Sequence, residues 1–218
     1  MTNKDIKNAY VGTTEVKAMY LGSTKVWPVE PLPRPQIGDF VYSDKTWSAE
    51  LDSTKTCVGV IVIVRDNTFD FCALDVSLGT IRWGNNSLIS GITTTEDMST
   101  AMKDFEGKSN TVLNTEYGKA GYYCNKYFTE GFIASTWFLP ALGQLVSYYT
   151  NKEIIDQNIE KAGGETIKTD GSIGYWSSTQ ATATNAWRIL WDDKTNIYAS
   201  TKNTFMYVRA FSTCDYSL

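Results

Sequence analysis

The sequence predicts an α+β domain preceded by a short β-rich arm, and three observations support this fold class. Residues 186–191 and 205–211 alternate with a period of two, which is typical of strands. Residues 57–64 form a continuous apolar strand, and residues 142–149 place apolar side chains at helical spacing. Strands near both ends of the domain, with helices between them, favour a mixed arrangement.

The N-terminal arm is predicted from a ten-residue repeat, because residues 9–16 (AYVGTTEV) recur as residues 19–26 (MYLGSTKV). Each unit predicts short strands around a tight glycine turn, and together they suggest a small meander. Residues 1–27 are too few to bury a core, so they pack on their own domain or dock on another protein. Residues 28–36 contain four prolines and predict a semi-rigid linker before the main domain, residues 37–218.

The main domain begins with a strand at residues 38–42 and a polar loop. Residues 57–64 are expected at the centre of a sheet because they are apolar throughout. Residues 69–74 follow a turn and return antiparallel to that strand, while residues 80–91 predict a loop.

Two helices are expected in the middle of the domain. Residues 94–105 combine a threonine cap with early acidic residues, and Gly107 ends this helix. Residues 110–111 begin a turn, and residues 117–128 predict the second helix.

Two more helices follow. Pro140 suits the first turn of the third helix. The side chains expected on its buried face are Leu142, Leu145, Val146 and Tyr149. Residues 152–162 predict a further helix, which ends at Gly163.

The C-terminal strands predict one buried face and one outward face. Trp187, Ile189 and Trp191 alternate with Arg188 and Leu190, so the first three are expected in the core. The same alternation separates Tyr207, Arg209 and Phe211 from Met206, Val208 and Ala210.

Charge and residue types exclude several function classes. The net charge of −4 argues against nucleic-acid binding, which favours basic surfaces. No apolar stretch reaches the ~18 residues of a membrane span, and no signal peptide is visible. The chain has no histidine, which removes Ser-His-Asp catalysis and histidine-ligated zinc.

The remaining chemistry-bearing residues do not predict an active site. Cys57 and Cys72 lie in the two segments of an expected hairpin, so a disulfide and buried free thiols both stay open. A glycosidase needs two carboxylates about 5–9.5 Å apart across a cleft. Asp192 and Asp193 would point to opposite faces of a strand. We therefore predict no enzyme activity, no cofactor and no metal ion.

Five motifs in order between residues 94 and 211 resemble a bacterial and phage branch of the C-type lectin fold. They are Trp137-Phe138-Leu139-Pro140, Gln144-Leu145, Tyr175-Trp176-Ser177-Ser178, Ala186-Trp187 and Val208-Arg209. Members of that branch include the variable proteins of diversity-generating retroelements, among them phage tropism determinants. The N-terminal repeat is similar to short arms of phage tail proteins.

The resemblance implies a C-type lectin-like domain whose C-terminal strands present the ligand face. Trp176, Trp187 and Arg209 would then be scaffold residues. Calcium binding is not expected, because Glu30-Pro31 lies in the linker and Trp191-Asp192-Asp193 only loosely matches the calcium-binding strand of such lectins.

The function implied by the resemblance is that of a receptor- or ligand-binding protein, namely a phage tail protein or prophage-encoded adhesin. A retroelement would diversify its binding face, and its ligand would be a host cell-surface protein or glycan. Residues 1–27 would attach it to a virion tail or a bacterial surface assembly, and a homo-oligomer stays open. The alternative is a non-enzymatic structural or fimbria-like surface subunit.

The predicted ligand-binding face combines the loop after Trp-Ser-Ser with the two strands that follow it. Its residues are Gln180, Thr182, Asn185, Arg188, Leu190, Asp193, Asn196, Tyr198, Thr201 and Asn203. An arginine, a tyrosine and small polar side chains are typical of protein or glycan recognition.

Overall fold

The computed structural model describes residues 9–11, 14–16, 19–21, 24–27, 33–75, 78–169, 171, 173–191 and 196–216. Contacts between Cα atoms divide the chain into two compact units, Met1–Arg34 and Pro35–Ser217. The predicted linker, residues 28–36, spans this division.

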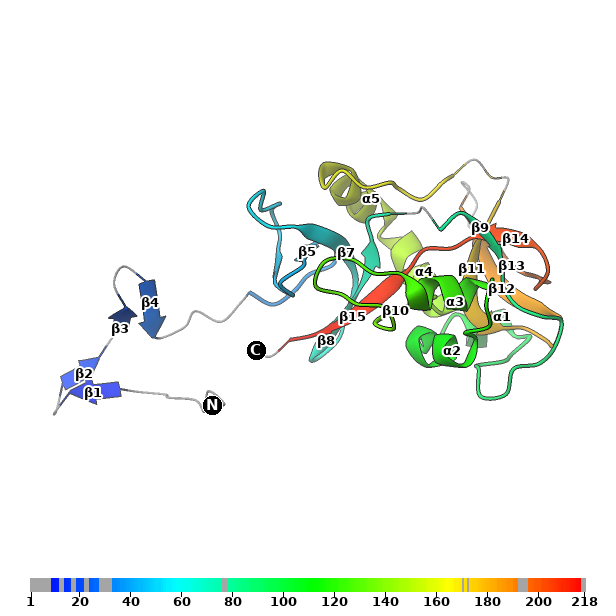
Figure 1. Ribbon diagram of the computed structural model, residues 1–218, viewed down its shortest axis with the longest axis horizontal. Coiled ribbons are helices and arrows are strands. Elements are labelled where there is room, and N and C mark those ends of the chain that lie inside the picture. The colour runs from blue at the N-terminus through cyan, green and yellow to red at the C-terminus, as the bar shows by residue number, and fades with distance from the viewer. Residues whose placement is uncertain are drawn as a thin grey trace. The chain divides into compact units, whose positions relative to one another are not determined.

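The N-terminal unit contains two β-hairpins (Figure 1). β1 (Ala9–Val11) pairs antiparallel with β2 (Thr14–Val16), and β3 (Met19–Leu21) pairs antiparallel with β4 (Thr24–Trp27). Near the turns equivalent positions pair, since Tyr10 is opposite Glu15 and Tyr20 is opposite Lys25, but a register shift in the second hairpin places Met19 opposite Trp27. The short strands are as predicted, but the described strands form two separate sheets instead of a meander, because each repeat closes its own hairpin.

The first sheet of the second unit has six strands in the order β10-β15-β8-β7-β5-β6. They are β5 (Phe40–Tyr42), β6 (Trp47–Ser48), β7 (Cys57–Val64), β8 (Thr68–Ala73), β10 (Trp137–Phe138) and β15 (Phe211–Asp215). As predicted, β7 lies inside the sheet and β8 returns antiparallel to it. The C-terminal strand β15 pairs with β8, so the end of the chain completes a sheet begun near residue 40.

The second sheet has five strands in the order β13-β12-β11-β14-β9. They are β9 (Thr80–Arg82), β11 (Tyr175–Gln180), β12 (Asn185–Leu190), β13 (Asn196–Thr201) and β14 (Phe205–Tyr207). Neighbouring strands are antiparallel, except that β11 and β14 are parallel. The prediction of a loop at residues 80–82 is wrong, because β9 is a strand only through its pairing with the distant β14.

The helices are α1 (Met98–Ala101), α2 (Gly107–Leu113), α3 (Ala120–Lys126), α4 (Leu142–Thr150) and α5 (Lys152–Lys161). Within residues 94–105 only the single turn of α1 is helical, and its cap is Asp97 instead of a threonine. Gly107 begins α2 and does not end α1, and the predicted turn at residues 110–111 lies inside α2. Packing explains this glycine, because an added Cβ would lie 2.2 Å from Oε1 of Gln144.

The two longest helices agree better with the sequence. α4 begins one residue after its cap, Ala141, so Pro140 precedes the helix. Leu142 and Leu145 are buried as expected, whereas Tyr148 and not Tyr149 is the fully buried tyrosine. α5 ends at Lys161 and is followed by Gly163, whose positive φ of 76° is typical of a helix terminus.

The core of the second unit consists of two apolar clusters. One contains Trp83, Trp137 and Trp176, and the other contains Trp187 and Trp191 with apolar residues of α4 and α5. Trp176 and Trp187 are therefore buried, as we predicted for scaffold residues.

The predicted outward face of residues 206–211 is wrong, because this segment passes between the two clusters. Met206, Val208 and Ala210 belong to the first cluster, and Phe211 belongs to the second. Arg209 is also buried and donates to the carbonyl oxygens of Ala73, Leu74 and Glu165.

The cysteines of the second unit are free thiols, and Cys57 and Cys72 are not joined. The strand register places Val60 opposite Cys72 and Tyr42 opposite Cys57. Among the residues that the structure describes, no helix is long and apolar enough to span a bilayer.

Candidate functional site

The candidate binding face lies on the strand pair β12–β13, at one edge of the five-stranded sheet. Arg188 is directly opposite Tyr198, and Leu190 is opposite Asn196, so these four side chains belong to one face. Arg188, Leu190 and Asn196 are half-buried, and Tyr198 is 43% exposed. We call these four residues, with Ser200, the β12–β13 face.

The opposite side of β12 packs on the core. Trp187, Ile189 and Trp191 are all buried, which confirms the alternation predicted for this strand. The Trp187 indole N–H also donates to the carbonyl oxygen of Thr95 at 2.8 Å. The direction in which Arg188 points is therefore fixed by its neighbours in the sequence.

Arg188 is the charged side chain of the β12–β13 face, and two neighbours hold its guanidinium in place. Its Nε donates to Oγ of Ser200 at 2.7 Å, and its Cζ lies 5.1 Å from the centre of the Tyr198 ring. Burial lowers the pKa of the guanidinium from its usual value. Sequence reasoning missed Ser200, although the period of two from Tyr198 would have placed it on the same face.

Gly174 makes room for this arrangement. A Cβ at this position would lie 2.8 Å from Nη1 of Arg188 and 3.2 Å from its Cδ. Any larger residue would therefore force the arginine to move. The guanidinium is held between the Gly174 backbone, the Ser200 hydroxyl and the Tyr198 ring.

The ten predicted site residues do not form one surface. Asn185 is opposite Thr201 in the register, and this pair has the same orientation as Trp187, away from Arg188. Thr182 accepts hydrogen bonds from the backbone N–H groups of its own turn, and Asn203 is exposed in the turn after β13. Asp193 lies outside the described residues.

Gln180 corrects our prediction of an exposed loop residue. It is the last residue of β11, and its side chain is fully buried. Its Nε2 donates to the Ile89 carbonyl oxygen and to Oγ1 of Thr94, and its Oε1 accepts from the Ile89 N–H. Gln180 therefore anchors the loop before α1 and is not available on the surface.

Lys202 completes this anchor, and it did not stand out in the sequence. It is fully buried in the turn between β13 and β14. Its Nζ donates to Oε1 of Gln180 at 2.7 Å and to the carbonyl oxygens of Ser87 and Ala183, and it lies 4.6 Å from the Trp83 ring. Burial lowers the pKa of Lys202 to about 8.

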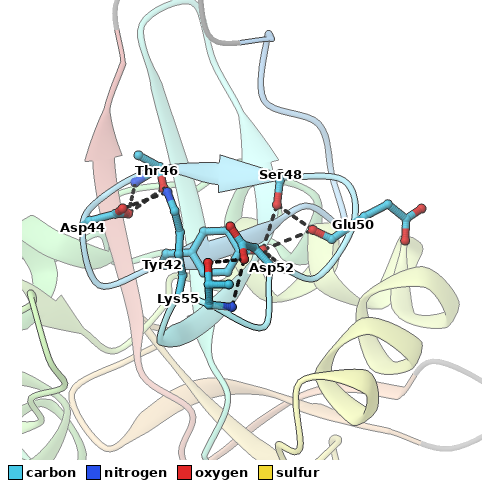
Figure 2. A network of polar contacts seen from close by, with 8 residues as sticks. Tyr42, Asp44, Thr46, Ser48, Glu50, Asp52 and Lys55 are labelled. Atoms are coloured by element: carbon cyan, nitrogen blue, oxygen red, sulfur yellow. Dashed lines mark hydrogen bonds and ion pairs between the residues drawn. The ribbon is translucent and has the colours of Figure 1, made fainter. Parts of the chain in front are cut away.

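A second polar cluster, in the β5–β6 region, is satisfied internally (Figure 2). The Tyr42 hydroxyl contacts Oγ of Ser48 at 2.7 Å and accepts from the Asp52 N–H at 2.7 Å. Lys55 is 2.8 Å from Asp44, and its hydrogen bond, with those of Thr46, lowers the pKa of Asp44 to about 2. Lys55 and Asp44 neutralise each other, so this cluster stabilises a loop. It is therefore a weaker candidate for a ligand site than the surroundings of Arg188.

Potential metal ligands do not converge in the described part of the chain. No group of three or more cysteine, aspartate or glutamate side chains there is arranged to hold a metal ion. Asp70 accepts from Gln144, Arg65 and Thr213, and Asp104 accepts from Thr179 and Asn110. These buried carboxylates are therefore engaged in holding the two sheets and the helices together.

Comparison with known proteins gives one informative likeness. No protein-family model and no curated protein matches the sequence. The fold is similar to the crystal structure of a fimbrial protein from Bacteroides ovatus ATCC 8483, with a TM-score of 0.62 and 16% sequence identity. The alignment covers 83% of this chain and 49% of the fimbrial protein, so the chain spans about half the length of that relative. At this identity the likeness establishes a shared α+β fold.

Proposed function

We propose that this chain is a non-enzymatic, fimbria-like subunit of a bacterial surface assembly, and that it binds an extracellular protein or glycan through the β12–β13 face. The observation that carries the proposal is the fold shared with a fimbrial protein over 83% of the chain. A surface location agrees with this likeness. The sequence supplies no histidine for catalysis, which agrees with a non-enzymatic role.

The N-terminal hairpins support a role in assembly. Two-stranded sheets are only marginally stable alone, so β1–β4 would be stabilised by packing on a partner surface. The second unit, by contrast, has two sheets and its own buried core. We therefore assign attachment to residues 1–27 and ligand binding to the second unit.

Deletion of residues 1–30 tests this division of labour. We expect the remaining chain to stay folded and monodisperse, and to be lost from surface assemblies of the producing bacterium while full-length protein is retained. Immunogold electron microscopy of the assemblies and a thermal melt of both purified proteins give the two results. Unfolding of the shortened chain would contradict the proposal, since the hairpins would then belong to the core.

A phage tail receptor-binding protein with a diversified face is the second candidate. It is favoured by β13, an edge strand whose small and polar side chains are all at least partly exposed. Its test is genomic and structural. A reverse transcriptase gene beside a near-copy of codons 175–211 that differs at adenines, together with the protein in purified virions, would favour this candidate over the fimbrial one.

A further inference from the structure

We propose that the ligand of the β12–β13 face carries a carboxylate, as an acidic sugar does, and that Arg188 is the residue that binds it. This inference rests on the proposed function, because it names the chemical class of ligand for the same face. It rests on two observations, the contacts that hold the Arg188 guanidinium in place and the lack of a described partner for its terminal nitrogens.

The guanidinium is positioned before any ligand arrives. Ser200 accepts from its Nε at 2.7 Å, the Tyr198 ring lies 5.1 Å from its Cζ, and Gly174 leaves the space that its Nη1 occupies. A long side chain that is already fixed loses less conformational freedom on binding. The contact through Nε also leaves both terminal nitrogens to donate in parallel, which matches the two oxygens of a carboxylate.

The terminal nitrogens of Arg188 have no hydrogen-bond or ion-pair partner within the described residues, in contrast to other cations of the second unit. Arg65 pairs with Asp70 at 2.7 Å. Arg209 and Lys202 are fully buried and donate to oxygen atoms of the protein. Arg188 is half-buried, so it has lost part of its hydration, and no carboxylate of the described residues pairs with it. An anionic ligand would restore the missing charge partner.

The surroundings of Arg188 favour a sugar. Tyr198 is 43% exposed, and the guanidinium lies over its aromatic ring, 5.1 Å from the ring centre. An aromatic ring combines an apolar face with a polar edge, which suits a sugar ring lying against it. The half-buried Leu190 and Asn196 add one apolar and one polar side chain to the same face. One acidic pyranose can contact Arg188 and Tyr198 together.

The test uses two probes that differ only at the carboxylate, oligogalacturonate and its methyl ester. The affinity of the full-length protein for each probe is measured by calorimetry. We expect the acid to bind about tenfold or more tightly than the ester, because a charged hydrogen-bonded pair is lost in the ester. Arg188→Gln should remove this preference, and Arg188→Lys should retain part of it, since lysine keeps the charge but not the fork.

Arg82→Gln is the matched control, because Arg82 lies 4.8 Å over the Phe205 ring in the same sheet but is itself exposed. It should leave the preference for the acid unchanged. Equal binding of acid and ester, no binding of either, or equal loss in Arg82→Gln and Arg188→Gln would each overturn the proposal. Binding of oligoglutamate but not of the sugar would replace the acidic sugar with an acidic peptide.

Failure of this inference and failure of the proposed function give different results. If Tyr198→Ala weakens attachment to target cells but Arg188→Gln does not, the face binds a ligand without a carboxylate. If neither variant changes attachment, the β12–β13 face is not the binding surface and the proposed function fails with it.

Discussion

Strands β11 and β13 belong to the same sheet and have similarly polar sequences, YWSSTQ and NIYAST, yet their environments are opposite. Every residue of β11 is buried, whereas no residue of β13 is. β11 lies between β12 and β14, and β13 lies at the edge of the sheet. The position of a strand in the sheet, and not its polarity, therefore decides which of the two can meet a ligand.

Burial of polar β11 requires a partner for each side chain, and the rest of the domain supplies them. Ser177 donates to the carbonyl oxygen of Trp187 at 2.8 Å, and Thr179 donates to Oδ2 of Asp104 at 2.6 Å. Asn110 donates to Oγ of Ser178 at 3.2 Å. These contacts join the loop and helices of residues 93–113 to the middle of the sheet, so β11 acts as a polar scaffold.

The largest expected effect on stability comes from a substitution in β11. Trp176→Ala should lower the free energy of unfolding by about 3–5 kcal/mol, because it removes a large buried side chain. The indole is fully buried, and its N–H donates to the Ile81 carbonyl oxygen at 3.0 Å. Urea denaturation measures this change. A cost below about 1 kcal/mol would mean that β11 is not held as described.

Gln180→Ala should come next, at about 2–4 kcal/mol, since each buried group left without a partner costs about 1–3 kcal/mol. The variant leaves Lys202 Nζ and both backbone groups of Ile89 without their side-chain partner. Asn203→Ala is the matched control, because it removes an exposed amide from the same region and should cost less than about 0.5 kcal/mol. If the two variants lower the free energy of unfolding equally, Gln180 is an exposed residue and not a buried one.

The fold could be predicted from the sequence where the pattern of a single segment decides its structure. The apolar strand at residues 57–64 and the helix at residues 152–161 were predictable, because their patterns are local and strong. β9 could not be predicted, since three residues became a strand only by pairing with β14 more than a hundred residues later. Gly107 was misassigned as a helix end because the contact that requires a glycine, with Gln144, lies in another helix.

The candidate site was predictable only where alternation within a strand decides direction. Arg188 and Tyr198 were placed correctly on an accessible side, and the same rule would have included Ser200. Gln180 and Lys202 could not be placed, because a glutamine and a lysine are usually exposed and these two are buried by contacts with residues 83–94. A polar side chain next to a predicted face is therefore weak evidence of an exposed site residue until its hydrogen-bond partners are known.

Lys202 gives a prediction about pH that tests its burial. Its pKa is lowered to about 8 from an ordinary value of 10.5, so between these pH values the unfolded chain binds a proton that the folded protein has lost. Stability rises with pH where the unfolded state binds more protons, so this group should raise the free energy of unfolding from pH 8 to 10. The difference between wild type and Lys202→Met isolates the effect from other groups. A flat difference over this range would show that Lys202 keeps its ordinary pKa, and a falling one would show that folding raises the pKa; either result contradicts the prediction.

The smallest effect on stability belongs to β13. Tyr198→Ala should change the free energy of unfolding by only about 0.5 kcal/mol, as is usual for an exposed position on an edge strand. This figure includes the lost contact with Arg188, because a cation–π pair at an exposed site contributes only about 0.5–1 kcal/mol. The same variant should nevertheless weaken ligand binding, since exposed aromatic side chains often carry much of the binding energy.

Two measurements on Tyr198→Ala therefore decide whether the edge strand serves binding and not folding. Urea denaturation gives the stability, and attachment to target cells gives the function, with Thr201→Ala as a control at an exposed position of the opposite face. Near-normal stability with reduced attachment, and no change in Thr201→Ala, is the expected pattern. If Tyr198→Ala proves as damaging to stability as Trp176→Ala, then β13 is part of the core and the difference between the two strands does not exist. Because the free energy and the attachment are measured on the same protein, a folding defect cannot be mistaken for loss of a ligand contact.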